Sequence, residues 1–316
     1  MKRYAFGIDI GGTTLKLGLF KTNGELMEKW ELPTRTEENG GYILTDIAEA
    51  IQQKLSDETI SAADVAGIGL GVPGPVGKDG TVYRCVNTGW GILNVEQKLE
   101  ALTGLKVRAG NDANVAALGE MWKGGGEGYR DLIMVTLGTG VGAGVIINGK
   151  IVSGKHGAAG EIGHMRVVEE ELNQCTCGNH GCLEQYASAR GIAAVASHYL
   201  KVHNNPVKVP TRLNNGKELT AKDIFDAAKC GDLLALNKVD EACKLLGKAL
   251  AQISCVIDPE VFVIGGGLSE AGEILINGIQ KYYQRYAFHA SKDTVFVKAR
   301  LGNDAGIYGG VKLVIE

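Results

Sequence analysis

Long apolar runs are absent from this sequence of 316 residues. No apolar stretch reaches the ~20 residues that a membrane-spanning helix needs, so we expect no membrane partner. The first residues, Met1 to Tyr4, lead directly into a short apolar strand, without the hydrophobic segment of a signal peptide. The sequence therefore predicts a protein that stays in the cytoplasm.

An excess of charge of one sign is also missing. The chain has 33 Lys and Arg against 36 Asp and Glu, which gives a formal net charge of -3 at pH 7. Proteins that bind nucleic acid usually show a clear basic surplus, so we expect no nucleic-acid partner. With 45% apolar residues at this length, the chain is long enough for two domains that each bury a core.

Cysteine is scarce outside one short segment. Three of the seven cysteines, Cys175, Cys177 and Cys182, lie within eight residues, and the others are scattered. An odd and scattered set fits a reduced cytoplasmic protein. His164 lies eleven positions before the cluster, and the glycines around the cysteines permit tight turns. Three thiolates and one imidazole in a Gly-rich loop predict a tetrahedral zinc site of the Cys₃His type.

Two other interpretations of the cluster stay open: three reduced cysteines that meet by chance, or a redox pair in Cys175-Thr176-Cys177. Zinc is favoured because a cysteine cluster in a chain otherwise poor in cysteine usually binds metal. Four protein ligands leave no open coordination position, so the ion would be structural. Glu161 and Glu184 bracket the cluster and are better placed to meet a substrate. We call residues 160–184 the cysteine loop and expect it to shape a substrate site.

Two Gly-rich turns join pairs of apolar strands. The first lies within residues 4–20 and the second within residues 132–151. Backbone N–H groups of such turns form nests that bind anions such as phosphate. Asp9 ends the first strand, and an acid beside a phosphate site predicts an intervening Mg²⁺. The alternative is an ordinary tight hairpin with Asp9 as a turn acid. The turn residues are Gly11, Gly12, Thr13 and Thr14 in the first hairpin, and Gly138, Thr139 and Gly140 in the second.

The second hairpin repeats the design of the first, and residues 301–310 echo residues 109–120. Internal similarity of this grade predicts a duplicated domain, in which each copy offers one phosphate-binding hairpin to a cleft between them. We expect residues 1–118 with 302–316 to form a smaller α/β domain. Residues 119–301 would then form a larger one that carries the cysteine loop.

Three further positions carry alternative interpretations. Asp112 follows the predicted strand 107–109 where a helix begins, so it is either the helix N-cap or a general base. Gly265–Gly267 follow the predicted strand 261–264 and either admit an adenosine or allow tight strand–helix packing. Trp90 either stacks on a sugar or anchors its loop. The remaining helices are predicted at 40–57, 184–202, 220–230, 232–254 and 304–314, with an exposed loop at 203–219.

Several motifs together resemble known families. DIGGT (9–13), LGTGVGAG (137–144) and GGGLS (265–269) look like the two phosphate motifs and the adenosine motif of the actin-like ATPase superfamily of sugar kinases. GEIGH (160–164) followed by CTCGNHGCLE (175–184) resembles the signature of the ROK family (repressors, open reading frames, kinases). NDANVAALGEMW (111–122) is similar to the glucokinases of Gram-positive bacteria within it. The resemblance implies an α/β, two-domain actin-like ATPase fold (ribonuclease H-like, duplicated) with an active-site cleft between the domains and a zinc-bound loop.

The resemblance, which covers nearly the whole chain, also implies an activity: ATP-dependent phosphorylation of glucose at its 6-hydroxyl by a cytoplasmic homo-oligomer, a dimer or a tetramer. Asp112 would be the general base. The sugar would be bound by Asn87, Asn111, Asp112, Glu161, His164 and Glu184. Zinc would be held by His164, Cys175, Cys177 and Cys182. Asp9 would position Mg²⁺, and the ATP phosphates would lie on Gly11, Gly12, Thr13, Thr14, Gly138, Thr139 and Gly140. The adenosine would lie on Gly265, Gly266 and Gly267.

Other functions remain as alternatives. N-acetylmannosamine, N-acetylglucosamine or fructose would fit the same motifs. A sugar-sensing regulator would need neither Asp9 nor Asp112, and the DNA-binding segment of ROK repressors is not expected before Tyr4. An actin-like filament or chaperone ATPase would lack sugar-binding carboxylates beside a cysteine loop. We further expect loss of zinc to weaken glucose binding while ATP binding at the distant hairpins stays nearly unchanged.

Overall fold

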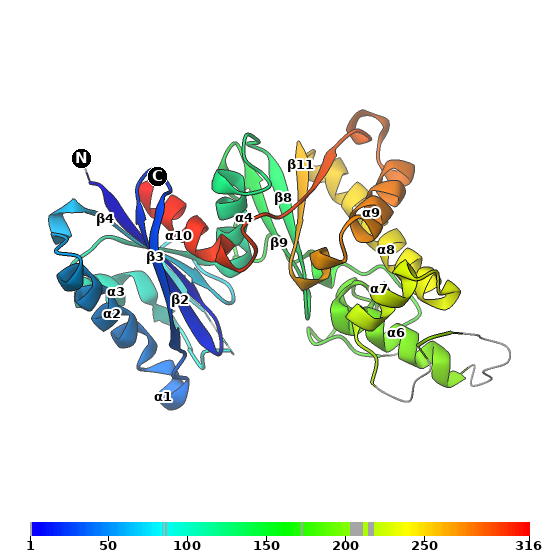
Figure 1. The fold of residues 1–316 in the computed structure, drawn as a ribbon, viewed down its shortest axis with the longest axis horizontal. Helices are drawn as coiled ribbons and strands as arrows, with labels where there is room; N and C mark the ends of the chain where they lie inside the picture. The colour runs from blue at the N-terminus through cyan, green and yellow to red at the C-terminus, as the bar shows by residue number, and fades with distance from the viewer. Residues whose placement is uncertain (1, 84, 86, 172, 203–210, 214–217) are drawn as a thin grey trace. The chain divides into compact units, whose positions relative to one another are not determined.

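A computed structural model describes residues 2–83, 85, 87–171, 173–202, 211–213 and 218–316. It contains two five-stranded sheets with equivalent strand orders, β3-β2-β1-β4-β7 and β10-β9-β8-β11-β12 (Figure 1). In the first sheet, β1 pairs antiparallel with β2 and parallel with β4, which in turn pairs parallel with β7. The repeated order confirms the α/β architecture with internal duplication that the sequence predicts.

The strands are β1 (Tyr4–Ile10), β2 (Thr14–Lys21), β3 (Leu26–Pro33), β4 (Val65–Val72), β5 (Thr81–Val82), β6 (Leu93–Asn94), β7 (Val107–Asn111), β8 (Leu132–Leu137), β9 (Val141–Ile147), β10 (Lys150–Ile151), β11 (Val261–Gly265) and β12 (Val295–Lys298). The helices are α1 (Glu37–Gly40), α2 (Ile43–Asp57), α3 (Val95–Thr103), α4 (Asp112–Lys123), α5 (Glu184–Ala187), α6 (Ala189–Val202), α7 (Ala221–Lys229), α8 (Leu233–Ile257), α9 (Glu273–Tyr286) and α10 (Ala305–Ile315).

The chain divides into two compact units. Unit 1 comprises Met1–Met134, Gly144–Gly160 and Arg300–Glu316, and unit 2 comprises Val135–Ala143 and Glu161–Ala299. The division passes within β8 and β9, so the second sheet contributes strands to both units. The domains predicted from the sequence, 1–118 with 302–316 and 119–301, remain a prediction.

The first sheet buries both of its faces because β1 alternates between two helix layers. Phe6, Ile8 and Ile10 point into the core that α2 and α3 cover, whereas Ala5 points into the core beneath α10. Successive side chains of a strand point to opposite faces, so this pattern follows from the strand itself. Helices α2 and α3 run side by side along the sheet in Figure 1. The helix predicted at 40–57 is confirmed as α2.

The two segments that echo each other in sequence pack together in unit 1. Each is a strand-to-helix junction, β7 to α4 and β12 to α10, and the two helices lie against each other. Their contact is close enough to require glycine: a Cβ placed on Gly309 would lie 1.7 Å from the carbonyl oxygen of Val115. The duplicated junctions therefore meet backbone to backbone.

A buried carboxylate fixes the far end of α4. Glu120 has no exposed surface, and its oxygens accept hydrogen bonds from the backbone N–H groups of Gly125 (2.7 Å), Arg300 (2.9 Å) and Leu301 (2.8 Å). It thereby ties α4 to the segment that leads into α10. Glu120→Ala leaves three backbone donors, one of them buried, without their charged acceptor, so we expect it to lower the free energy of unfolding by roughly 3 kcal/mol.

Urea denaturation of the purified variant measures this loss. Glu127→Ala is the matched control, because Glu127 is an exposed acid in the same stretch and its removal should change stability by less than about 0.5 kcal/mol. Equal stability of Glu120→Ala and Glu127→Ala would contradict the role of the buried carboxylate.

Unit 2 is mainly helical around β11 and β12. Helix α8 runs beside α9, and α6 and α7 lie next to each other (Figure 1). The helices predicted at 220–230 and 232–254 are confirmed as α7 and α8, while the one predicted at 184–202 is interrupted at Ser188. Most of the loop predicted at 203–219 lies outside the described residues. Within the described part of the chain, no helix combines the length and hydropathy needed to cross a membrane.

Candidate active site

The cysteine loop brings the four predicted zinc ligands together. The ligand atoms of His164, Cys175, Cys177 and Cys182 all lie within 4.8 Å of one another. Cys177 Sγ lies 3.7 Å from Cys182 Sγ, and Cys175 Sγ lies 3.8 Å from His164 Nδ1. Two sulfurs on a tetrahedral zinc, each about 2.3 Å from it, are about 3.8 Å apart. The donor set and its spacing fit a zinc ion.

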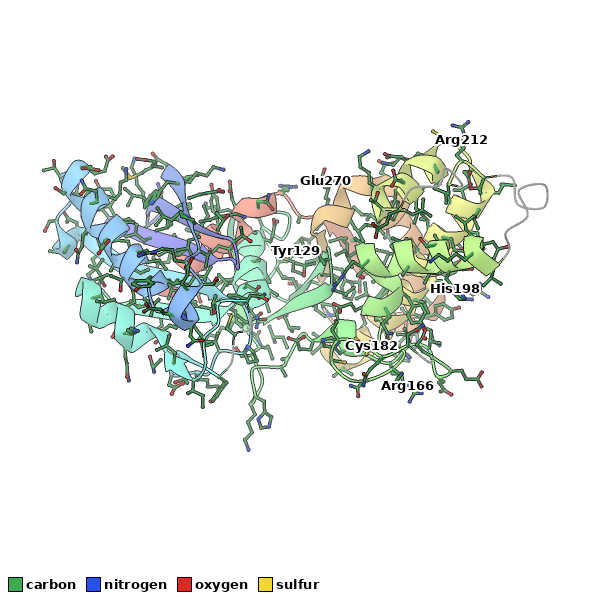
Figure 2. All side chains as sticks on the ribbon, turned by 90° about the horizontal axis from the view of Figure 1, so that it is seen from below. Tyr129, Arg166, Cys182, His198, Arg212 and Glu270 are labelled. Carbon is green, nitrogen blue, oxygen red and sulfur yellow. The ribbon has the colours of Figure 1, made fainter. Side chains whose placement is uncertain are left out.

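Backbone hydrogen bonds give the loop this shape. Cys175 N–H donates to Asn179 O at 2.7 Å, which closes a tight turn, and Val167 N–H donates to Gly181 O at 2.7 Å. Gly181 has a φ of +73°, and a Cβ on it would lie 1.8 Å from the carbonyl oxygen of Val168. Figure 2 shows Cys182 beside Arg166, its bridge partner on the facing segment. The loop is therefore a small framework around the four ligands.

The remaining ring nitrogen of His164 faces an acid. Its Nε2 lies 3.9 Å from Glu161 Oε2, while Nδ1 faces the thiols. Burial raises the pKa of the Cys182 thiol to about 12, so forming the thiolate there costs free energy. The positive charge of a bound ion offsets this cost. The loop thus presents Glu161 and one imidazole nitrogen on the side of the ring away from the thiols.

In unit 1 the parallel strands carry two acids to one edge of the sheet. Asp9 on β1 is in register with Gly71 on β4, and Val72 is in register with Asn111 on β7, just before Asp112. Neighbouring strands lie about 4.8 Å apart, which places the two acids roughly 10 Å from each other with Gly71 between them. A Cβ placed on Gly71 would lie 3.7 Å from Asp9 Oδ1 and 3.7 Å from Asp112 Cα, so this glycine separates the two acids at the carboxyl edge.

The ionised carboxylate of Asp9 is destabilised by its surroundings. Burial raises the pKa of its carboxyl group, and Lys16, whose Nζ lies 4.0 Å from Asp9 Oδ2, only partly offsets this. A raised carboxyl pKa means that the ionised form costs folding free energy at neutral pH. Wild type regains that free energy as the pH falls through the folded-state pKa.

Asp9→Asn removes this cost. We expect the variant to be more stable than wild type at pH 7 to 8, and the difference to shrink as the pH is lowered toward the folded-state pKa of Asp9. Urea denaturation of both proteins between pH 5 and 8 tests the sign. A variant less stable than wild type at pH 7 would show that the ionised Asp9 is already compensated in the folded protein.

Asn111, not Asp112, is the N-cap of α4. Asn111 Oδ1 accepts from Asn114 N–H at 3.2 Å, so the capping interpretation of Asp112 is wrong. Asp112 Oδ1 accepts from Asn111 Nδ2 at 2.9 Å and from Ala113 N–H at 2.8 Å. The carboxylate is therefore held in one orientation by its neighbours. The general-base interpretation of Asp112 stays a prediction.

Asn87 lies against the first hairpin turn. A Cβ on Gly12 would lie 3.3 Å from Asn87 Cβ, so the two are in close contact. Thr34 stabilises the turn from the other side, with its Oγ1 donating to Gly11 O at 2.7 Å. Trp90 is 4% exposed, and its Nε1–H donates to Gly40 O at 2.9 Å. Trp90 thus anchors its loop, and this geometry does not support stacking on a sugar.

The second hairpin turn, residues 138–141, contacts the end of the cysteine loop. Val141 N–H donates to Glu184 Oε2 at 3.0 Å, and Thr176 Oγ1 approaches Glu184 Oε1 at 3.5 Å. A Cβ on Gly140 would lie 2.3 Å from Glu184 Oε2, so the carboxylate occupies the side-chain space of this glycine. The expectation that the cysteine loop and both hairpins are distant is therefore wrong for the second hairpin.

A cavity of about 530 Å³ in unit 2 joins the second hairpin to the third Gly-rich motif. Its wall includes Thr139 from the turn and Gly267 from the motif, whereas Gly265 and Gly266 do not line it. Gly266 instead has a φ of +79° and packs against Leu137. Part of the wall was not foreseen from the sequence, which predicted a helix at 220–230 but no role for Ala221 and Phe225 of α7. The described wall residues are Gly138, Thr139, Ala189, Thr220, Ala221, Lys222, Phe225, Asp226, Lys229, Gly267, Leu268, Glu270 and Ala271.

Known proteins share this architecture over the full length. A glucokinase from Halalkalibacterium halodurans is 45% identical over 314 residues, which cover 99% of this chain and 95% of that protein. An N-acetyl-D-glucosamine kinase from Yersinia enterocolitica is 32% identical and covers 98% of each chain. The crystal structure of a ROK family glucokinase from Streptomyces griseus in complex with glucose and AMPPNP matches with a TM-score of 0.74 and 33% identity, covering 98% of each chain. Residues 5–316 match the ROK family itself, and the chain therefore belongs to the ROK family and has its two-domain α/β sugar-kinase fold.

Proposed function

We propose that this protein phosphorylates glucose at its 6-hydroxyl with MgATP. The observation that carries the proposal is the contact between Glu184 and the second hairpin turn, because it joins a carboxylate of the cysteine loop to a phosphate-type turn. The sugar that accepts the phosphoryl group and the ATP that donates it would then lie next to each other at this contact. The similarity to proteins named glucokinase supports glucose as that acceptor.

In unit 1, we propose Asp112 as the general base. A carboxylate whose orientation is fixed by two donors can accept the proton of the attacking hydroxyl without first losing side-chain freedom. Asn87 would donate a hydrogen bond to a sugar hydroxyl, and Asn111, whose Nδ2 already donates to Gly74 O and Asp112 Oδ1, would accept one through Oδ1. Asp9 would hold Mg²⁺, which when bound supplies positive charge to the donor phosphates.

In unit 2, we propose Glu161 and Glu184 as acceptors for further sugar hydroxyls, and His164 as a donor, because an imidazole with Nδ1 on zinc carries its proton on Nε2. His164 would use Nε2 for the sugar and Nδ1 for zinc, in keeping with the sides on which these atoms lie. The zinc ion would be structural, held by His164 and the three thiolates. The bound zinc would keep the His164 ring, and with it the neighbouring Glu161, in one orientation, because the residues around a metal site fix one another's positions.

The phosphates would be bound by backbone N–H groups of both hairpin turns: Gly11 to Thr14 and Gly138 to Gly140. Negative charge spreads over the transferred phosphoryl oxygens in the transition state, so donors fixed beforehand lower the barrier without reorganising. The adenosine would enter the cavity at Gly267, between α7 and the third Gly-rich motif. We also propose a cytoplasmic homo-oligomer, a dimer or a tetramer, with reduced cysteines.

A coupled assay that follows ADP release over a panel of hexoses tests this function. We expect the highest kcat/KM with glucose, and no ADP release when sugar is omitted. N-acetylglucosamine is the second candidate, since a relative at 32% identity carries that name. A higher kcat/KM with N-acetylglucosamine, N-acetylmannosamine or fructose would assign the acceptor differently, and no turnover with any of them would point to a sugar-sensing regulator.

A further inference from the structure

Residues 184–190, which run from the last residue of the cysteine loop into the first turn of α6, hold the second hairpin turn by three hydrogen bonds. This segment begins at Glu184, two residues after the thiol of Cys182, and the interruption at Ser188 starts a new helix directly at the turn. Ser188 Oγ accepts from Gly191 N–H at 3.0 Å. The three bonds run from Val141 N–H to Glu184 Oε2 (3.0 Å), from Ala189 N–H to Gly138 O (2.8 Å) and from Arg190 Nε to Thr139 O (3.0 Å).

These bonds orient peptide planes of the turn. In a trans peptide the carbonyl oxygen and the following N–H point in opposite directions. Holding Gly138 O therefore aims the N–H of Thr139, and holding Thr139 O aims the N–H of Gly140. A turn flanked by glycines has little side-chain packing of its own to resist a flip of these planes. Their direction therefore depends on the start of α6.

The side chain of Arg190 fixes the peptide plane between Thr139 and Gly140. It is exposed, and within the described part of the chain no carboxylate lies within ion-pair distance of it. Its recorded bond is the one from Nε to Thr139 O. Arg190 also lines a cavity on the α6 side of the turn together with Thr139 and Lys201.

We infer that Arg190 is a positioning residue for the phosphoryl donor. Its Nε–H holds the carbonyl of Thr139 so that the N–H of Gly140 stays directed at the donor's phosphates. This inference rests on the proposed function, which places phosphates at this turn. It assigns Arg190 a role through the backbone rather than through its charge.

The donating atom allows charge and position to be separated. In Arg190→Gln the side-chain amide nitrogen occupies the same place along the side chain as the arginine Nε, so it retains the donor and loses the charge. Arg190→Met has similar length and loses both. Lys201→Met is the control, because it removes an exposed cation from the same helix and cavity wall. No bond to the turn is recorded for Lys201 within the described residues.

The experiment measures the Kd of Mg-AMPPNP by calorimetry without sugar, the Kd of glucose without nucleotide, bound zinc, and KM for ATP. Arg190→Met should raise the AMPPNP Kd and the ATP KM about tenfold, with the glucose Kd within twofold of wild type and zinc unchanged. Arg190→Gln should stay within about threefold of wild type, and Lys201→Met within twofold.

Equal losses in Arg190→Gln and Arg190→Met would overturn the inference in favour of simple charge attraction, as would a loss in Lys201→Met as large as in Arg190→Met. An unchanged Arg190→Met would show that the bond has no role. The AMPPNP readout does not depend on turnover, so it tests the inference even if glucose is not the acceptor. Wild-type protein that binds no AMPPNP would overturn the inference and the proposed function together.

Discussion

Asp112→Asn should abolish most of the turnover and leave the fold intact. The variant loses the proton acceptor, and loss of a general base typically lowers kcat by about 10²–10⁴. Asparagine keeps the Oδ1 that accepts from Asn111 Nδ2 and Ala113 N–H, and the helix cap belongs to Asn111. We therefore expect a kcat at least about a hundredfold below wild type, with the Kd of glucose and the melting temperature little changed.

Asn111→Ala is the reference for the stability measurement alone, because Asn111 also orients Asp112 and is proposed to bind the sugar. It removes the cap of α4 and should cost about 1 kcal/mol of unfolding free energy. If Asp112→Asn lost as much stability as Asn111→Ala and kept its kcat, Asp112 would be a structural residue of the helix terminus. A pH profile separates the two further, since only a catalytic Asp112 carries an acidic limb of kcat that disappears in the variant.

Cys177→Ala should release the zinc and weaken the binding of both glucose and ATP. The purified wild-type protein should contain one zinc per chain, and the variant almost none, because three remaining ligands hold the ion far less tightly. With the loop relaxed, Glu161 and His164 lose their orientation, and the KM for glucose should rise at least about tenfold. Cys177 is exposed at the edge of the cluster, so the rest of unit 2 should stay folded.

The effect on the nucleotide departs from the expectation drawn from sequence. Glu184 lies between Thr176 of the cysteine loop and Val141 of the second hairpin, so relaxing the loop should also raise the KM for ATP, by a smaller factor. Cys255→Ala, which removes another exposed thiol far along the chain, is the control and should change neither KM nor the zinc content. A zinc-free wild type, or unchanged KM values in Cys177→Ala, would contradict a structural metal.

Local features were readable from the sequence because their physics acts over a few residues. The spacing of Cys175, Cys177 and Cys182 within a Gly-rich loop already predicts a metal cluster, and the structure brings these thiols and His164 together. The Gly-rich turns between apolar strands predicted both hairpins. The helices predicted at 40–57, 220–230 and 232–254 are likewise present, as α2, α7 and α8. The helix predicted at 184–202 was less accurate, since nothing in its periodicity signals the interruption at Ser188.

The sequence by itself therefore determined the two hairpins, the duplicated α/β plan, the cysteine cluster and the family. The hairpins, the duplicated plan and the cluster depend on turn chemistry, strand alternation and ligand spacing, which neighbouring residues fix, whereas the family follows from the resemblance of the motifs to those of known proteins. Only the tertiary structure decided that Glu184 and Arg190 hold the second hairpin, that Glu120 binds residues far along the chain, and that α7 walls a cavity. Each of these joins groups distant in sequence, and a hydrogen bond of this kind exists only once the packing of the whole unit has brought donor and acceptor within about 3 Å.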